Sequence, residues 1–113
     1  MRRGEIWIAR LNPNKGHEIG KTRPVLVMQA DSLTAIGNNP VIVVPMTTRV
    51  YPSFTKWRIR IPARDRLLKP CQVAVDQPRS LDRSRFGDGP LTMLTEEEMA
   101  AVERSLKAVM GLD

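Results

Sequence analysis

Short apolar runs, each bounded by glycine, proline or asparagine, make up most of the chain before its last segment. Residues 4–11 are rich in β-forming residues and lead into an Asn-Pro-Asn turn cluster at 12–14. Residues 24–30 and 41–46 are continuous apolar runs of strand length, a pattern typical of strands buried on both faces. Between these two strands, the pattern predicts a short helical turn within residues 31–40.

The later strands are expected to be short. Residues 72–77 and 89–94 each have the composition of a brief strand. Residues 55–61 alternate strictly between polar and apolar, so that Trp57 and its apolar neighbours are expected in the core. The opposite face of this strand is then solvated and basic, and carries Lys56, Arg58 and Arg60.

The end of the chain has the pattern of an amphipathic helix. Thr95 is a suitable N-cap, and Glu98 three residues later completes a capping box, while Gly111 can end the helix. The apolar positions at helical spacing, expected to pack on the sheet, are Met99, Val102, Leu106 and Val109 or Met110. The element order therefore predicts a mainly β domain: a small, strongly bent sheet or barrel with one C-terminal α-helix against it.

Composition narrows the class of protein. A length of 113 residues predicts one domain over residues 1–113. No apolar run approaches the roughly 20 residues that cross a membrane, and the first residues lack the apolar segment of a signal peptide. Cys71 has no second cysteine to pair with, which fits a reducing cytoplasm. With a single histidine and a single cysteine, neither a metal site nor a cofactor is expected.

Positive charge is concentrated in one segment. The formal net charge is +6, and residues 49–69 carry seven Lys and Arg side chains against one carboxylate. Alternate residues of a strand are about 6–7 Å apart, close to the phosphate spacing of an extended nucleic acid. A solvated basic face with no ligand would give the same pattern, but such concentration favours an anion-binding surface. Tyr51 and Phe54 beside it are candidates for stacking on a base.

The loop at 15–23 combines residues that could cleave RNA. Such cleavage requires a group that accepts the 2′-hydroxyl proton and a group that stabilises the charged phosphorane. Glu18 and Arg23 fit these two tasks, and a strand-end hydroxyl of Thr47 or Thr48 could hold a non-bridging oxygen. A simple salt bridge between Glu18 and Arg23 is the plainer alternative. His17 is expected at most to contact a phosphate.

Several motifs together resemble one family. They are R-G-E-I-W near the start, K-G-x-E-x-G-x-x-R-P-V-L-V from residue 15, P-x-T-T at residue 45 and a later D-Q pair. The whole chain is similar to MazF/PemK-type toxins of bacterial toxin–antitoxin pairs. The resemblance implies a small SH3-like, CcdB/PemK-type β-barrel that works as a homodimer. It also implies a metal-independent endoribonuclease that cuts single-stranded RNA to 2′,3′-cyclic phosphate and 5′-hydroxyl ends, and an acidic antitoxin of MazE type as partner.

Matched residue by residue, the resemblance assigns the catalytic roles to Arg23, Thr47 and Glu18. The residues expected to bind or support the RNA are His17, Lys21, Thr48, Arg49, Lys56, Arg58, Arg60, Asp76 and Gln77. The chain departs from the family pattern at Ile19, where many members have glutamine, and across residues 49–56.

Two other functions remain compatible with this fold. The same barrel serves toxins that bind DNA gyrase without phosphodiester chemistry, and a plain SH3-like RNA-binding module would share the basic surface. A purely binding protein would not need the combination of Glu18, Arg23 and Thr47, so the nuclease is the favoured interpretation.

Overall fold

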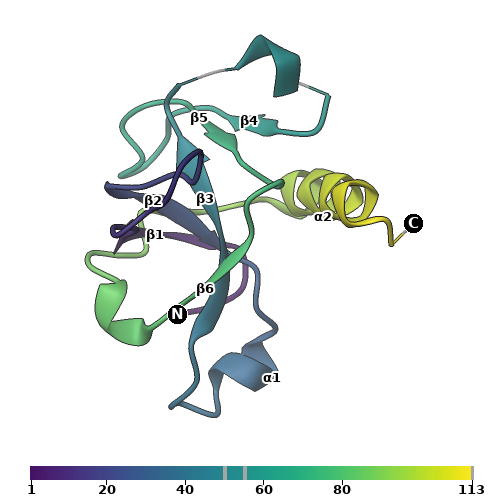
Figure 1. Ribbon diagram of the computed structural model, residues 1–113. Helices are drawn as coiled ribbons and strands as arrows, with labels where there is room; N and C mark the ends of the chain where they lie inside the picture. The colour runs from purple at the N-terminus through teal and green to yellow at the C-terminus, as the bar shows by residue number, and fades with distance from the viewer. Residues whose placement is uncertain (50, 55, 113) are drawn as a thin grey trace.

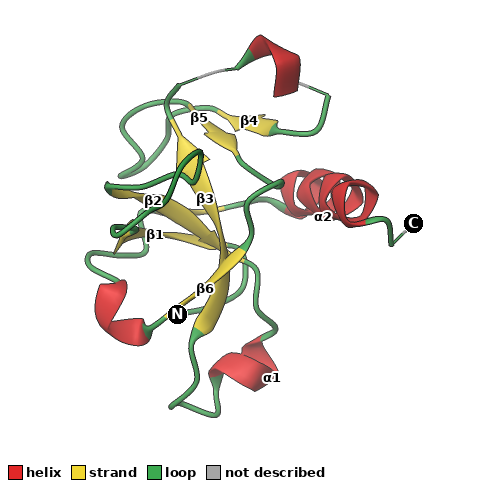
Figure 2. Cartoon of the chain, in the orientation of Figure 1, coloured by secondary structure: helices red, strands yellow, loops and turns green. Residues whose placement is uncertain are grey.

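The computed structural model describes residues 1–49, 51–54 and 56–112, which form a bent β-sheet beside one long helix (Figure 1). Secondary structure along the chain is shown in Figure 2. The strands are β1 (Glu5–Arg10), β2 (Thr22–Val27), β3 (Val41–Thr47), β4 (Ile59–Ile61), β5 (Cys71–Val73), β6 (Arg79–Leu81) and β7 (Thr92–Met93). The helices are α1 (Asp31–Thr34) and α2 (Glu96–Met110), with short 3₁₀ turns η1 (Pro52–Phe54) and η2 (Arg83–Arg85).

Strand β3 pairs with three other strands and connects the two parts of the sheet. The strand order is β4-β5-β3-β2-β1-β7, with β6 paired to β3 outside this path, and the pairs are antiparallel. The first part of β3, residues 41–43, pairs with β6, whereas its last residues Met46 and Thr47 pair with β5. Because β3 exchanges one neighbour for another along its length, the sheet bends into a half-barrel (Figure 1).

The two faces of the sheet bury different side chains. One face carries Ile6, Leu26, Val44 and Met46, which pack with the buried side of α2. The alternate residues of the same strands form a second cluster, including Ala9, Val25, Val27, Val41 and Val43. Since both faces are covered around the centre of the sheet, residues 25–27 and 43–46 are apolar and buried, as the continuous apolar runs predicted.

Helix α2 is stabilised at both ends as the sequence predicts. The hydroxyl of Thr95 accepts from the backbone of Glu98, and the Glu98 carboxylate accepts from the backbone of Thr95. Gly111 ends the helix with φ +71°. Met99 and Val102 are buried, but Met110 is 54% exposed, so the expectation that the whole apolar stripe packs on the sheet is wrong. The last turn extends beyond the sheet (Figure 1).

The strands predicted at 4–11, 24–30 and 41–46 are confirmed, as is the helical turn after residue 31. Of the strand predicted at 55–61, only β4 at its end forms. Residue 55, the first of the predicted range, lies outside the described part of the chain. Strand β6 was not expected, because its three residues follow a proline and include a single apolar side chain. Within the described residues, no helix is long and apolar enough to cross a membrane.

Candidate active site

Arg23 and Thr47, from two neighbouring strands, line the same pocket. The ladder between β2 and β3 pairs Val25 with Pro45, and continuing the antiparallel register by two residues places Arg23 opposite Thr47. Directly opposed residues point to the same face of a sheet. Both side chains line one open pocket of about 340 Å³, named here the Arg23 pocket. The sequence-predicted pair is therefore brought together where β2 begins and β3 ends.

The guanidinium of Arg23 is oriented by the loop before it. Its Nε donates to the carbonyl of Gly20 at 2.8 Å. Although Arg23 and Glu18 line the same pocket, no ion pair joins them in the described part of the chain. Burial raises the pKa of the Cys71 thiol, and the charge of Arg23 acts in the opposite direction. The plainer alternative of a Glu18–Arg23 salt bridge is thus not what this structure contains.

Thr47 is buried, with its hydroxyl held in place. Its Oγ1 accepts from the backbone N–H of Arg49 at 3.1 Å. A hydroxyl has one donor hydrogen and two acceptor positions. Since the Arg49 bond uses an acceptor position, the hydroxyl hydrogen can still donate to a ligand in the pocket. Thr48 is exposed beside it.

The loop from residue 12 to residue 21 is held in a defined conformation. Gly20 packs so closely against Asn12 and Asn14 that an added Cβ would lie 2.3 Å from Asn14 Oδ1. Lys21 has φ +66°, and its backbone N–H donates to Asn12 Oδ1 at 2.8 Å. A non-glycine residue in this conformation is uncommon. The asparagines of the predicted turn cluster therefore fold back and fix the end of the loop.

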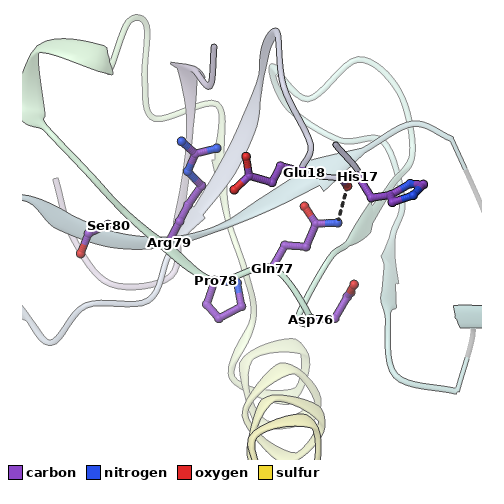
Figure 3. A pocket seen from close by; sticks show the side chains of 7 residues that line it. All are labelled: His17, Glu18, Asp76, Gln77, Pro78, Arg79 and Ser80. Carbon is purple, nitrogen blue, oxygen red and sulfur yellow. Dashed lines mark hydrogen bonds between the residues drawn. The ribbon is translucent and has the colours of Figure 1, made fainter. Parts of the chain in front are cut away.

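Glu18 lies at the tip of this loop. Its Oε1 accepts from the backbone N–H of Lys15 at 2.5 Å, and its carbonyl accepts from Asn14 Nδ2 at 3.2 Å. The side chains of His17 and Glu18 extend in opposite directions from the loop (Figure 3). Only one carboxylate oxygen is used by Lys15, so the other remains available at the exposed edge of the pocket.

Gln77 fixes the loop from the opposite side. The Ile19 backbone N–H donates to Gln77 Oε1 at 2.8 Å. Gln77 Nε2 donates to the carbonyl of His17 at 3.3 Å, the bond drawn in Figure 3. Both ends of its amide are therefore bonded to the loop. Gln77 was expected to bind or support RNA, and its contacts indicate the supporting role. A second pocket of about 700 Å³, named here the Gln77 pocket, is lined by His17, Glu18, Asp76, Gln77, Pro78, Arg79 and Ser80.

Arg58 differs from its expected position on a solvated strand face. It is only 5% exposed, and its guanidinium donates to both carboxylate oxygens of Asp76 at 2.7 and 2.9 Å. Hydrogen bonding from Arg58 lowers the pKa of Asp76, against the opposing effect of burial. Trp57, expected in the core, is 37% exposed. The strict alternation fails here because Arg58 lies before β4 begins and turns inward to a carboxylate.

The basic residues expected to bind RNA do not form one row. Lys56 is exposed next to α2, and Arg60 is exposed beside Pro62, so they line separate hollows. Lys21 and Arg49, in contrast, line the Arg23 pocket itself. The structure thus places part of the predicted RNA-binding set at the candidate site and part of it outside.

An aromatic ring completes the rim of the Arg23 pocket. The guanidinium carbon of Arg49 lies 4.9 Å from the centre of the Tyr51 ring, and that of Arg58 lies 5.6 Å from it. Cations at such distances are attracted to the face of an aromatic ring. The side chain of Phe54, the other stacking candidate, lies outside the described part of the structure.

Two pocket residues, Arg79 and Asn14, were not predicted from the sequence. Arg79 comes from a strand that was not predicted, and Asn14 comes from a turn.

Fold and site together define a class of protein: a β half-barrel with one C-terminal helix and a cationic pocket between a loop and a strand end. The family model described as "PemK-like, MazF-like toxin of type II toxin-antitoxin system" matches residues 2–110. The chain belongs to this toxin family, and the predicted CcdB/PemK-type fold is confirmed.

Solved structures give the same result. MazF from Deinococcus radiodurans matches with 27% identity and a TM-score of 0.80, over 98% of this chain and 96% of that one. A MazE–MazF complex from the same organism matches with 25% identity and a TM-score of 0.77, over 100% and 97%. A structure described as an endoribonuclease with its cognate antitoxin from a mycobacterial species matches with 19% identity and a TM-score of 0.77, over 100% and 97%. At 19% identity, this last match shows the fold alone.

Proposed function

We infer that this toxin is a metal-independent endoribonuclease that cuts single-stranded RNA and leaves 2′,3′-cyclic phosphate and 5′-hydroxyl ends. The observation that carries the proposal is the convergence of Arg23, Thr47 and Glu18, from a strand start, a strand end and a loop, around one pocket. The family supports the same activity, since its members are generally endoribonucleases.

The chemistry follows from the positions of these groups. The Glu18 carboxylate accepts the 2′-hydroxyl proton as the 2′-oxygen bonds to phosphorus. Arg23 stabilises the charge that develops on the phosphoryl oxygens, and the Thr47 hydroxyl donates to one of them. The bond from phosphorus to the 5′-oxygen then breaks, and that oxygen takes up a proton at the open side of the pocket.

Other side chains position the RNA. Lys21 and Arg49 supply positive charge at the rim of the Arg23 pocket, and Tyr51 offers a ring for base stacking. His17 contacts a flanking phosphate or base, and Thr48 adds a hydroxyl next to the site. The ion pair between Arg58 and Asp76 supports the segment that leads into Gln77, while Lys56 and Arg60 attract the RNA at longer range.

The partners proposed for this protein are a second copy of the chain and an acidic antitoxin in the cytoplasm. The family consists of toxins with cognate antitoxins, and a matching relative has been solved as a MazE–MazF complex. A segment with seven cations and one carboxylate suits an acidic partner that competes with RNA.

The decisive experiment incubates the purified protein with single-stranded RNA in excess EDTA and maps the ends of any products. Cleavage with cyclic phosphate and 5′-hydroxyl ends is expected, and Arg23→Ala should abolish it. Binding to RNA without cleavage would instead identify a plain RNA-binding module. Neither binding nor cleavage, together with inhibition of DNA gyrase, would identify the non-catalytic toxin.

A further inference from the structure

A third pocket lies beside the candidate active site, and the described residues that line it are all polar or basic. It has a volume of about 440 Å³ and is lined by Arg10, Asn12, Lys21, Thr22, Ser84 and Arg85. Lys21 lines this hollow, named here the Arg10 pocket, and the Arg23 pocket as well. The two pockets are therefore neighbours, with Lys21 on the boundary between them.

Two arginines in the Arg10 pocket each donate to backbone carbonyls of the opposite segment. Arg10 Nη2 donates to the carbonyl of Ser84 at 2.6 Å. In return, Arg85 Nη1 donates to the carbonyls of Arg10 and Asn12, at 3.2 and 2.5 Å. Because a guanidinium has five N–H donors, each arginine is fixed in place by some donors and retains others for a ligand.

The positive charge of this pocket is largely uncompensated. Arg10, Lys21 and Arg85 form no ion pair within the described residues. The carboxylate of Asp82 acts on Arg85 alone: its pKa is lowered mainly by hydrogen bonds from Ser84 and, to a smaller extent, by the charge of Arg85. Three cations thus line the hollow, while the Asp82 carboxylate is not among the lining groups and is already bonded to Ser84.

We propose that the Arg10 pocket binds a backbone phosphate of the RNA, beyond the phosphate cleaved in the Arg23 pocket. The inference rests on the proposed function and adds a substrate subsite to it. Lys21, shared by both pockets, would bridge two successive parts of the RNA backbone. The enzyme would then hold a longer stretch of RNA than the cleaved step alone.

The lining favours a phosphate over an acidic protein segment. Phosphate oxygens in nucleic acids are bound by Arg and Lys, assisted by Ser, Thr and Asn, and this pocket contains all five residue types. Protein interfaces, in contrast, have an apolar or aromatic centre. Among the residues that the structure describes, no apolar side chain lines the Arg10 pocket.

The test compares two fluorescent single-stranded oligodeoxynucleotides, which lack the attacking 2′-hydroxyl, of about twelve and about three nucleotides. Binding is measured by anisotropy over a range of salt concentrations for wild type, Arg10→Gln/Arg85→Gln and Arg10→Lys/Arg85→Lys. Arg104→Gln/Lys107→Gln, which removes two exposed charges of helix α2, is the matched control. Poly-L-glutamate serves as an acidic polypeptide probe, and circular dichroism verifies folding.

The glutamine variant is expected to bind the long oligonucleotide about fivefold more weakly, with a salt slope smaller by about 0.7 to 1. The short oligonucleotide should bind the glutamine variant as tightly as it binds wild type. The lysine variant should bind the long oligonucleotide almost as tightly as wild type does. Unchanged binding of the long oligonucleotide, or equal weakening for both lengths in both variants, would overturn the inference. So would a loss confined to poly-L-glutamate. If wild type bound neither oligonucleotide, the proposed function itself would fail, and this inference with it.

Discussion

Arg58 and Asp76, 18 residues apart in the chain, form a two-point ion pair that lies next to the residue holding the active-site loop. The side chain of Arg58 is 3% exposed and that of Asp76 is 25% exposed. Gln77, which bonds to His17 and Ile19, follows Asp76 directly. The pair thus connects the segment before β4 with the segment that supports the loop.

Asp76→Asn is expected to lower the free energy of unfolding by about 2–4 kcal/mol. The change removes the negative charge from the two-point pair with the buried Arg58 guanidinium, and loss of one charge from a buried pair is strongly destabilising. Urea denaturation followed by circular dichroism measures the effect. Asp88→Asn is the control, because its pair with Arg66 is 3.5 Å long and solvent-exposed, and it should cost less than about 0.5 kcal/mol. Equal effects from both variants would contradict the structural role of the pair.

The same ion pair predicts how stability depends on pH. Arg58 lowers the pKa of Asp76 in the folded protein, so folding favours the ionised carboxylate. A group with a depressed folded pKa stabilises the protein above its unfolded pKa of about 4 and loses that effect as pH falls through the folded value. Unfolding free energies measured from neutral pH downward should therefore decrease less steeply for Asp76→Asn than for wild type. Parallel curves would show that Asp76 does not couple folding to protonation.

Gln77→Ala tests the support of the loop. Without the amide, the Ile19 N–H and the His17 carbonyl lose their partners, so Glu18 between them is held less firmly. Cleavage should slow by about tenfold or more, since small misplacements of a catalytic group are costly. The exchange of the Ile19 amide hydrogen should accelerate, while global stability changes little. Ser80→Ala, an exposed residue of the same pocket, is the control. Slower cleavage with unchanged Ile19 exchange would point to direct RNA contact instead.

The proximity of Arg23 and Thr47 could be predicted from the sequence because both border recognisable strands. Arg23 directly precedes one apolar run and Thr47 directly follows another, so hydrophobic pattern and chemistry select them together. Arg58 could not be placed in this way, because alternation assumes that the strand continues, and its partner Asp76 is distant in the chain. The role of Gln77 depends on a loop 58 residues earlier, which no local pattern can indicate. Strand β6 is too short for its periodicity to be detected.

Arg23→Ala tests the catalytic assignment. Arg23 lines the same pocket as Thr47, and its guanidinium is oriented by the Gly20 carbonyl, so it can meet the charge that develops on the phosphate. The kcat for RNA cleavage should fall by about two to four orders of magnitude. Binding of an uncleavable 2′-deoxy substrate should weaken far less. Arg23→Lys should restore little, since an ammonium cannot reproduce the planar fork.

Thr47→Ala provides the comparison within the same pocket, because a hydroxyl positions the phosphate without carrying charge. It should reduce kcat less than Arg23→Ala does, and thermal unfolding should show that both variants are folded. If Arg23 acted only by fixing the loop through Gly20, activity and melting temperature would fall together, and Gln77→Ala would produce the same combined loss. A well-folded Arg23→Ala protein that cut RNA at nearly the wild-type rate would end the catalytic assignment.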